Sequence, residues 1–143
     1  MKLLLALLLL VSPAFASQEQ IHRWKSATVT ATTDLFGDVE MTVTADDKGN
    51  LKTLVVKVKG KTIDVPAKWI ATLPAVPIAS LEIRTERGRG KEPWLYAFFR
   101  TGSEDVKGTI RLHVMFRGGK LEEALKQVTE SATTSKSEFI KAP

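Results

Sequence analysis

The sequence contains no cysteine, and this absence removes several classes of protein at once. Disulfide-stapled scaffolds, cysteine-ligated zinc sites, iron–sulfur clusters and thiol nucleophiles all need cysteine side chains. For the same reason we expect no lipid anchor attached through a cysteine. A secreted eukaryotic domain of this size usually carries disulfides, so their absence favours a bacterial protein whose core alone stabilises the fold.

Histidine is scarce as well, and the common catalytic motifs are missing. The two histidines, His22 and His113, do not form the HExxH spacing of a zinc site. The chain has no nucleophile elbow of the G-x-S-x-G type and no glycine-rich phosphate or dinucleotide motif. The acidic run at residues 46–50 does not have the alternating carboxylates of a calcium loop, and a turn is the favoured interpretation. We therefore expect no metal and no cofactor.

Long apolar runs are absent except at the start of the chain. Residues 3–11 are apolar, follow Lys2, and precede the small residues Ala14 and Ala16. This layout is typical of a secretory signal peptide, and the run is too short for a membrane span, which needs about 20 residues. We predict that residues 1–16 are cleaved. The protein is then expected in the periplasm or outside the cell, without a membrane span.

The remaining composition is that of a folded protein. Hydrophobic residues make up 43% of the 143 residues and charged residues 26%, which fits one domain with a closed core. We find no internal repeat and no second domain boundary. The sequence therefore predicts a single β-rich domain over residues 17–143.

Most of this domain alternates apolar and polar residues with a period of two, which indicates half-buried strands. Turn-forming residues separate the alternating segments, as expected for a meander of antiparallel strands. The predicted strands are residues 27–33, 38–45, 54–59, 62–65, 78–86, 93–100 and 109–117.

Three segments depart from the alternation. Pro66 can begin a short helix near residues 66–73, which Pro74 then ends. Near residues 120–130 the period changes, and the spacing of the apolar residues predicts an amphipathic helix. The apolar positions of this segment are Leu121, Ala124, Leu125 and Val128. Residues 131–143 are predicted to form a mobile tail.

The predicted fold is mainly β, either a single antiparallel β-sandwich or a partly open barrel of about seven strands. The alternative is an α+β fold in which the C-terminal helix packs across an antiparallel sheet. Both arrangements bury one face of each strand and leave the other face to solvent.

Positive charge is concentrated in residues 84–117. This stretch holds eight basic residues against four acidic ones, and it contains six of the seven arginines. If its strands are neighbours, Arg84, Arg111 and Arg117 share a face directed away from the core. Arginine binds carboxylate and phosphate groups at two points, so this face is suited to an anionic ligand.

Residues 93–100 are apolar on both faces, and alternation alone leaves two orientations open. One set consists of Trp94, Tyr96, Phe98 and Arg100, and the other of Leu95, Ala97 and Phe99. If the first set faces outward, the surface combines aromatic and arginine side chains and suits a sugar, a nucleotide or an acidic chain. If it faces inward, the arginines are ordinary solvated charges. Their expected partners are then Glu82, Glu86 and Glu92.

Two functions follow from these observations. The favoured one is an exported binding or interaction module that engages an anionic small molecule, a glycan or an acidic protein. The candidate binding residues are Arg84, Trp94, Tyr96, Arg100, Arg111, His113 and Arg117. We expect no nucleic-acid partner, because the Arg-Gly repeat at residues 87–90 is short and an exported protein rarely meets nucleic acid.

The alternative is a small periplasmic hydrolase or isomerase with its active site in a β-barrel pocket. A carboxylate acts there as the acid or base, assisted by Tyr96 or His113. The carboxylates near one hairpin end, Asp34, Asp38 and Glu40, are candidates for an acid/base pair. This hypothesis requires a concave pocket that holds two such groups within hydrogen-bond reach.

Overall fold

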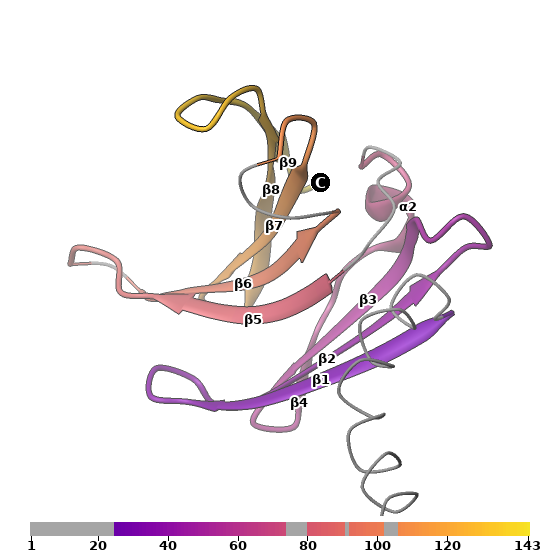
Figure 1. The fold of residues 1–143 in the computed structure, drawn as a ribbon. Coiled ribbons are helices and arrows are strands. Elements are labelled where there is room, and N and C mark those ends of the chain that lie inside the picture. The colour runs from indigo at the N-terminus through magenta and orange to yellow at the C-terminus, as the bar shows by residue number, and fades with distance from the viewer. Residues whose placement is uncertain (1–24, 74–79, 91, 102–105) are drawn as a thin grey trace, which may run out of the picture.

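The computed structural model describes residues 25–73, 80–90, 92–101 and 106–143. The predicted signal peptide lies outside these residues. The chain first forms a four-stranded antiparallel sheet in which the strands follow one another in chain order (Figure 1). Its strands are β1 (Ser26–Thr33), β2 (Gly37–Ala45), β3 (Leu51–Val58) and β4 (Lys61–Ile63).

A second antiparallel sheet of five strands follows, again in simple chain order. Its strands are β5 (Ser80–Glu86), β6 (Trp94–Arg100), β7 (Ile110–Arg117), β8 (Lys120–Thr129) and β9 (Ser135–Lys141). Figure 1 shows the two sheets as separate layers, with β5 running above β1 and β2. The predicted mainly β, sandwich-like fold is confirmed, and the described strands form two sheets rather than one closed barrel.

The core lies between the two sheets and comes from the inward residues of the alternating strands. Met41 and Val56 of one sheet and Leu95 and Val114 of the other are fully buried. Alternation therefore produces this core directly, because each strand presents one apolar face to the opposite sheet.

A short helix, α2 (Ala67–Ile70), confirms the helix expected near residues 66–73 and closes one end of the sandwich. Trp69 and Ile70 are buried in the core. The Trp69 indole Nε1–H donates a hydrogen bond of 2.8 Å to the backbone oxygen of Lys141, 72 residues further along the chain. The helix thus connects the first sheet to the last strand of the second. Within the described part of the chain, no helix is long and apolar enough to cross a membrane.

The predicted amphipathic helix near residues 120–130 is wrong, because this segment is strand β8. Gly118 and Gly119 both have positive φ values, 60° and 72°, as a tight two-residue hairpin turn requires. This turn folds the chain back onto β7. Pairing with β7 outweighs the helix propensity of the Leu, Glu, Ala and Lys residues in the segment, which is only a weak local preference.

An irregular register explains why β8 resembles a helix in sequence. Met115 pairs with Glu123 but Phe116 pairs with Leu121, so Glu122 is an extra residue on β8. This bulge lets Leu121 and Ala124 both pack against the core although they are three positions apart. The spacing of Leu121, Ala124 and Val128, three and then four residues, is therefore compatible with a bulged strand as well as with a helix. The alternative α+β fold is therefore wrong, because the helix that it places across the sheet is strand β8.

The segment expected to be a tail also contains regular structure. Ser135–Lys141 form β9, which pairs with β8 along its whole length, for example Phe139 with Leu125. Ile140 packs against the core. The turn between the two strands is fastened by hydrogen bonds from the Glu130 and Ser131 amides to the Thr134 carbonyl.

A candidate anion-binding face on the five-stranded sheet

The register of the second sheet places all seven candidate binding residues on its outer side. Arg84 lies opposite Tyr96 in the β5–β6 pair. Across β6 and β7, Trp94 pairs with Arg117, Phe98 with His113 and Arg100 with Arg111. We call this surface the arginine–aromatic face. It consists of Arg84, Trp94, Tyr96, Phe98, Arg100, Arg111, His113 and Arg117.

The two orientations that the sequence left open for residues 93–100 are thereby resolved. Leu95, Ala97 and Phe99 point into the core, with exposures of 0%, 0% and 1%. Tyr96 and Trp94 lie on the outer side and stay partly exposed. The aromatic residues of the outer set therefore share a surface with the arginines instead of filling the space between the sheets.

Phe98 is an outward residue that is nevertheless fully buried, with 0% exposure. The Arg84 guanidinium carbon lies 3.6 Å from the centre of its ring, a cation–π contact. The His113 ring packs against another side, with ring centres 4.7 Å apart and planes at 69°. The outer side of β6 is thus covered by polar side chains of this chain itself.

A second guanidinium covers the tryptophan at the other end of β6. The Arg117 guanidinium carbon lies 4.4 Å from the centre of the Trp94 ring, and Trp94 in turn stacks on Tyr96 at 6.3 Å. Because arginines occupy ring faces, the surface offers guanidinium donors to a ligand at these positions. This favours carboxylate, phosphate or sulfate groups over a neutral sugar stacked on an open ring.

Two arginines of this face, Arg84 and Arg117, form ion pairs with glutamates. Such pairs are expected of ordinary solvated arginines. Arg84 donates from Nε and Nη2 to Glu82 at 3.1 Å and 2.9 Å. Arg117 lies 3.6 Å from Glu122. Both pairs are partly exposed to solvent, so each contributes little to stability and leaves the arginine able to exchange partners. Glu86 pairs with a different residue.

Glu86 accepts a hydrogen bond of 2.7 Å from the Tyr96 hydroxyl. Burial, and then the Glu86 carboxylate, raise the pKa of Tyr96 well above its usual value. The phenol therefore remains protonated at all physiological pH values. Tyr96 acts as a hydrogen-bond donor and not as a base.

The centre of the face carries polar atoms without partners. The Arg111 Nε and the His113 Nε2 are buried, and no described group forms a hydrogen bond with either. Arg111 also lies directly opposite Arg100, and like charges in that position repel each other. The unpaired, buried Nε–H of Arg111 disfavours the free protein, and a hydrogen bond to a bound anion relieves this cost.

His113 is held neutral by this environment. Burial is the main cause that lowers its pKa, and the nearby Arg84 and Arg111 lower it further. A hydrogen bond with Gln127 acts in the opposite direction. At neutral pH His113 therefore adds no positive charge to the face.

The structure extends the face beyond the candidates found in the sequence. Leu125 of β8 lies opposite His113, and Phe139 of β9 lies opposite Leu125. Phe139 is 60% exposed, the largest exposure among the large hydrophobic residues of the described chain. These residues were missed because β8 was expected to be a helix. The Gly118-Gly119 pair, a strong hairpin signal, could have revealed them.

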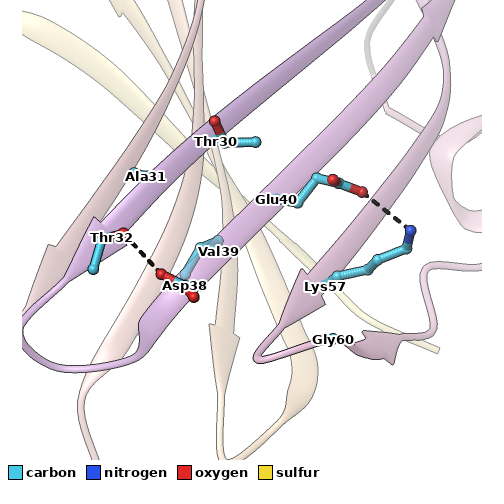
Figure 2. A pocket seen from close by; sticks show the side chains of 8 residues that line it. All are labelled: Thr30, Ala31, Thr32, Asp38, Val39, Glu40, Lys57 and Gly60. Atoms are coloured by element: carbon cyan, nitrogen blue, oxygen red, sulfur yellow. Dashed lines mark hydrogen bonds and ion pairs between the residues drawn. The ribbon is translucent and has the colours of Figure 1, made fainter.

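The outer side of the first sheet holds a different kind of hollow, shown in Figure 2, with a volume of about 490 Å³. It contains two of the three carboxylates proposed as an acid/base pair, Asp38 and Glu40. Asp38 accepts a hydrogen bond of 2.8 Å from Thr32, and Glu40 accepts one of 3.1 Å from Lys57 (Figure 2). Each carboxylate thus has its own partner, and the two do not share a proton.

The carboxylates of this hollow and the proposed assisting groups, Tyr96 and His113, lie on opposite outer faces of the sandwich. Apolar side chains of both sheets pack in the space between the sheets, and no carboxylate of the described residues is part of this core. The Tyr96–Glu86 pair is within hydrogen-bond reach, but it lies on the exposed outer side. The described residues thus contain no acid/base site between the sheets.

The acidic run at residues 46–50 forms the turn between β2 and β3, as the sequence indicated. The Asp46 carboxylate accepts hydrogen bonds of 2.9 Å from the Lys48 and Asn50 amides. The Asn50 amide is the main cause that lowers the pKa of Asp46. Asp46 thus caps its own turn, and no group of three or more metal-ligating side chains occurs within residues 25–73, 80–90, 92–101 and 106–143.

Comparison with family models, with curated proteins and with solved structures yields no match to this chain.

Proposed function

We propose that the chain is an exported binding protein that engages an acidic surface of a partner protein through the arginine–aromatic face. The observation that carries this proposal is the cross-strand register, which gathers four arginines and two partly exposed aromatic residues on one sheet face. Tryptophan, tyrosine and arginine are the residue types most enriched in energetic hot spots of protein interfaces.

The shape of the surface favours a macromolecule over a small molecule. Small ligands usually bind in concave pockets that enclose most of their surface. The proposed site is instead the outer side of three adjacent strands, and its guanidinium groups are spread along β5, β6 and β7. An acidic segment of a partner can contact several of these arginines at once, whereas a lone small anion reaches one or two.

The unpartnered Nε of Arg111 supports a charged ligand at the centre of the face. Hydrogen bonds between arginine and carboxylate are roughly twice as strong as those between neutral groups. A partner carboxylate that reaches Arg111 also reduces its repulsion with Arg100. Arg111 is therefore expected to contribute more binding energy than the arginines that already contact glutamates.

Binding of immobilised poly-L-glutamate, measured by surface plasmon resonance, tests this proposal. Arg111→Ala is expected to weaken binding about thirtyfold, which corresponds to the roughly 2 kcal/mol of an interface hot spot. Arg89→Ala is the matched control, because it removes the same charge from the turn after β5. Affinity should also fall as sodium chloride rises, since the Debye length shrinks from about 8 Å at 0.15 M to about 3 Å at 1 M.

Two results would overturn the proposal. One is equal affinity of the Arg111→Ala and Arg89→Ala variants for poly-L-glutamate, with unchanged circular dichroism. The other is wild-type binding to heparin but not to poly-L-glutamate, which would assign the face to sulfated glycans. Export is tested separately: the mature protein from a periplasmic fraction should begin at Ser17.

A further inference from the structure

A second hollow opens between the two sheets, at the end of the sandwich where the β3–β4 and β7–β8 turns lie. Its volume is about 390 Å³, within the range of pockets that hold small ligands. The apolar part of its lining comes from both sheets. It consists of Phe36, Val58, Ile63, Leu95 and Phe116.

The floor of this pocket is continuous with the core. Leu95 and Phe116 are 0% and 1% exposed, and Ile63 of the first sheet is 7% exposed. Strand β4 is only three residues long, so the first sheet is narrow at this end. An apolar group that enters the pocket therefore contacts the partly buried Phe36 and Val58, which pack against the core.

The rim of the pocket is basic. Lys59, Lys61 and Arg117 line it, and no carboxylate does so among the described residues. Arg117 already contacts Glu122 at 3.6 Å. Glu92, which lies just before β6, is an acidic residue near this rim, and its carboxylate lies next to Gly118 in the β7–β8 turn. Lys59 and Lys61 have no ion-pair partner within the described chain, so their charges face the pocket mouth uncompensated.

Lys59 occupies a backbone conformation that lysine seldom adopts. Its φ is 49°, and it is the one non-glycine residue with positive φ in the described part of the chain. Asn or Gly would satisfy this turn position with less strain. The turn instead carries a lysine whose side chain lies over Gly37, next to the pocket. The protein thus has a lysine at the rim of the pocket although the backbone conformation there is unfavourable for lysine.

We propose that this pocket binds the alkyl chain of a medium-length fatty carboxylate, with the carboxylate at Lys59 and Lys61. The apolar lining removes the chain from water, and the basic rim selects a negatively charged head over a neutral one. This site lies between the sheets and is separate from the acidic-partner surface proposed above. Arg117 is the one residue that borders both.

Isothermal titration calorimetry with sodium octanoate, decanoate and dodecanoate tests the apolar part. Each added methylene that enters the pocket should tighten binding about fourfold until the pocket is full. Val58→Phe fills the pocket and should abolish binding. The matched control is Val55→Phe, because Val55 lies on the outer side of the same strand and is 40% exposed.

The charged part is tested with a double neutralisation, Lys59→Asn with Lys61→Gln. It should weaken decanoate binding at least tenfold and leave binding of the methyl ester of decanoate unchanged. Asn tolerates positive φ, so the turn is expected to keep its shape. The control is Lys48→Asn with Lys52→Gln, which removes the same charge near the β2–β3 turn.

The proposal fails if wild-type protein shows no saturable binding of any of the three carboxylates. It also fails if Val58→Phe binds decanoate as well as Val55→Phe does. Equal weakening by the two lysine double variants would show nonspecific charge attraction and would likewise overturn it. Arg111→Ala should bind decanoate normally, so loss of the outer-face function and loss of the pocket function remain distinguishable.

Discussion

The two sheets share one core but have contrasting outer faces. On the first sheet, outward threonines pair with each other and with neighbouring polar groups, as Thr28 does with Thr42 and Thr32 with Asp38. On the second sheet, arginines cover aromatic rings, and Arg100 lies opposite Arg111. The inner residues are apolar on both sheets, so the fold alone does not require this difference.

The contrast separates outer-face residues that only stabilise the sandwich from outer-face residues that are candidates for a function. Threonine suits a half-exposed strand and satisfies its hydroxyl locally, which makes the outer side of the first sheet a stable solvated surface. The outer side of the second sheet keeps buried polar atoms without partners, among them Arg111 Nε and His113 Nε2. A surface that keeps such unfavourable features is a better candidate for function than one that has none.

The largest expected difference between the faces concerns Phe98. Phe98→Ala should lower the free energy of unfolding by about 3–5 kcal/mol, because it removes a fully buried ring and leaves Arg84 and His113 without their packing partner. Thr42→Ala, in the middle of the first sheet's outer face, should cost less than about 1 kcal/mol. Chemical denaturation monitored by circular dichroism measures both. Similar losses of unfolding free energy in the two variants would contradict the difference between the two outer faces.

The turns of the two sheets should also respond differently. Gly118→Ala places a Cβ at a φ of 60° and into the space of the Glu92 carboxylate, and it should cost about 1–2 kcal/mol. Gly60→Ala, at a φ of 77° with open space around it, should cost less. Thermal unfolding of both variants checks this order. If Glu92→Ala, which removes the clashing side chain, does not reduce the cost at Gly118, strain in the backbone alone accounts for it.

A smaller effect of opposite sign is expected at Arg111. Arg111→Thr removes an unpartnered buried donor and the repulsion with Arg100, and it makes the second sheet resemble the first. It should raise the free energy of unfolding by about 0.5 kcal/mol while it weakens poly-L-glutamate binding. Gain in stability with loss of binding is the behaviour of a functional residue. Loss of both would show that Arg111 serves the fold.

The smallest effect concerns pH. Because the pKa of His113 is lower in the folded protein than in the unfolded chain, folding favours the neutral imidazole. The stability that His113 contributes is fully present above the pKa of histidine in the unfolded chain, about 6.5. It is lost as the pH falls below that value. Urea denaturation at pH 7.5 and pH 5 should show a decrease that His113→Gln reduces. The charged groups facing His113 include Arg84 and Arg111, so a decrease that persists in this variant would point to other groups.

Much of this architecture was predictable from alternation. The strands of the first sheet and β5 to β7 were located correctly, because each buries one face and exposes the other. The orientation of β6 was not predictable, since its outer side is also apolar. Phe98 is buried there by Arg84 and His113, two residues that are distant in sequence and become neighbours only through strand pairing.

The error in β8 has a local cause. Helix-forming residues and a bulge at Glu122 produce a helical spacing, and only pairing with β7 decides the conformation. The inter-sheet pocket could not be predicted from the sequence either, because its apolar lining comes from two sheets and its lysines from the β3–β4 turn and the first residue of β4. No local pattern encodes which strand ends meet across a sandwich.

The hydrogen bond from Trp69 to the Lys141 carbonyl has a consequence for the order of folding. The indole belongs to α2, which follows the first sheet, yet its acceptor is the backbone oxygen of Lys141 in β9. The first sheet can pair locally as soon as its hairpins exist, but its capping helix is satisfied only after β9 has been synthesised and has docked. Contacts this distant in sequence form slowly. We therefore expect the nascent chain to remain incompletely packed, and accessible to chaperones, until its last strand is available.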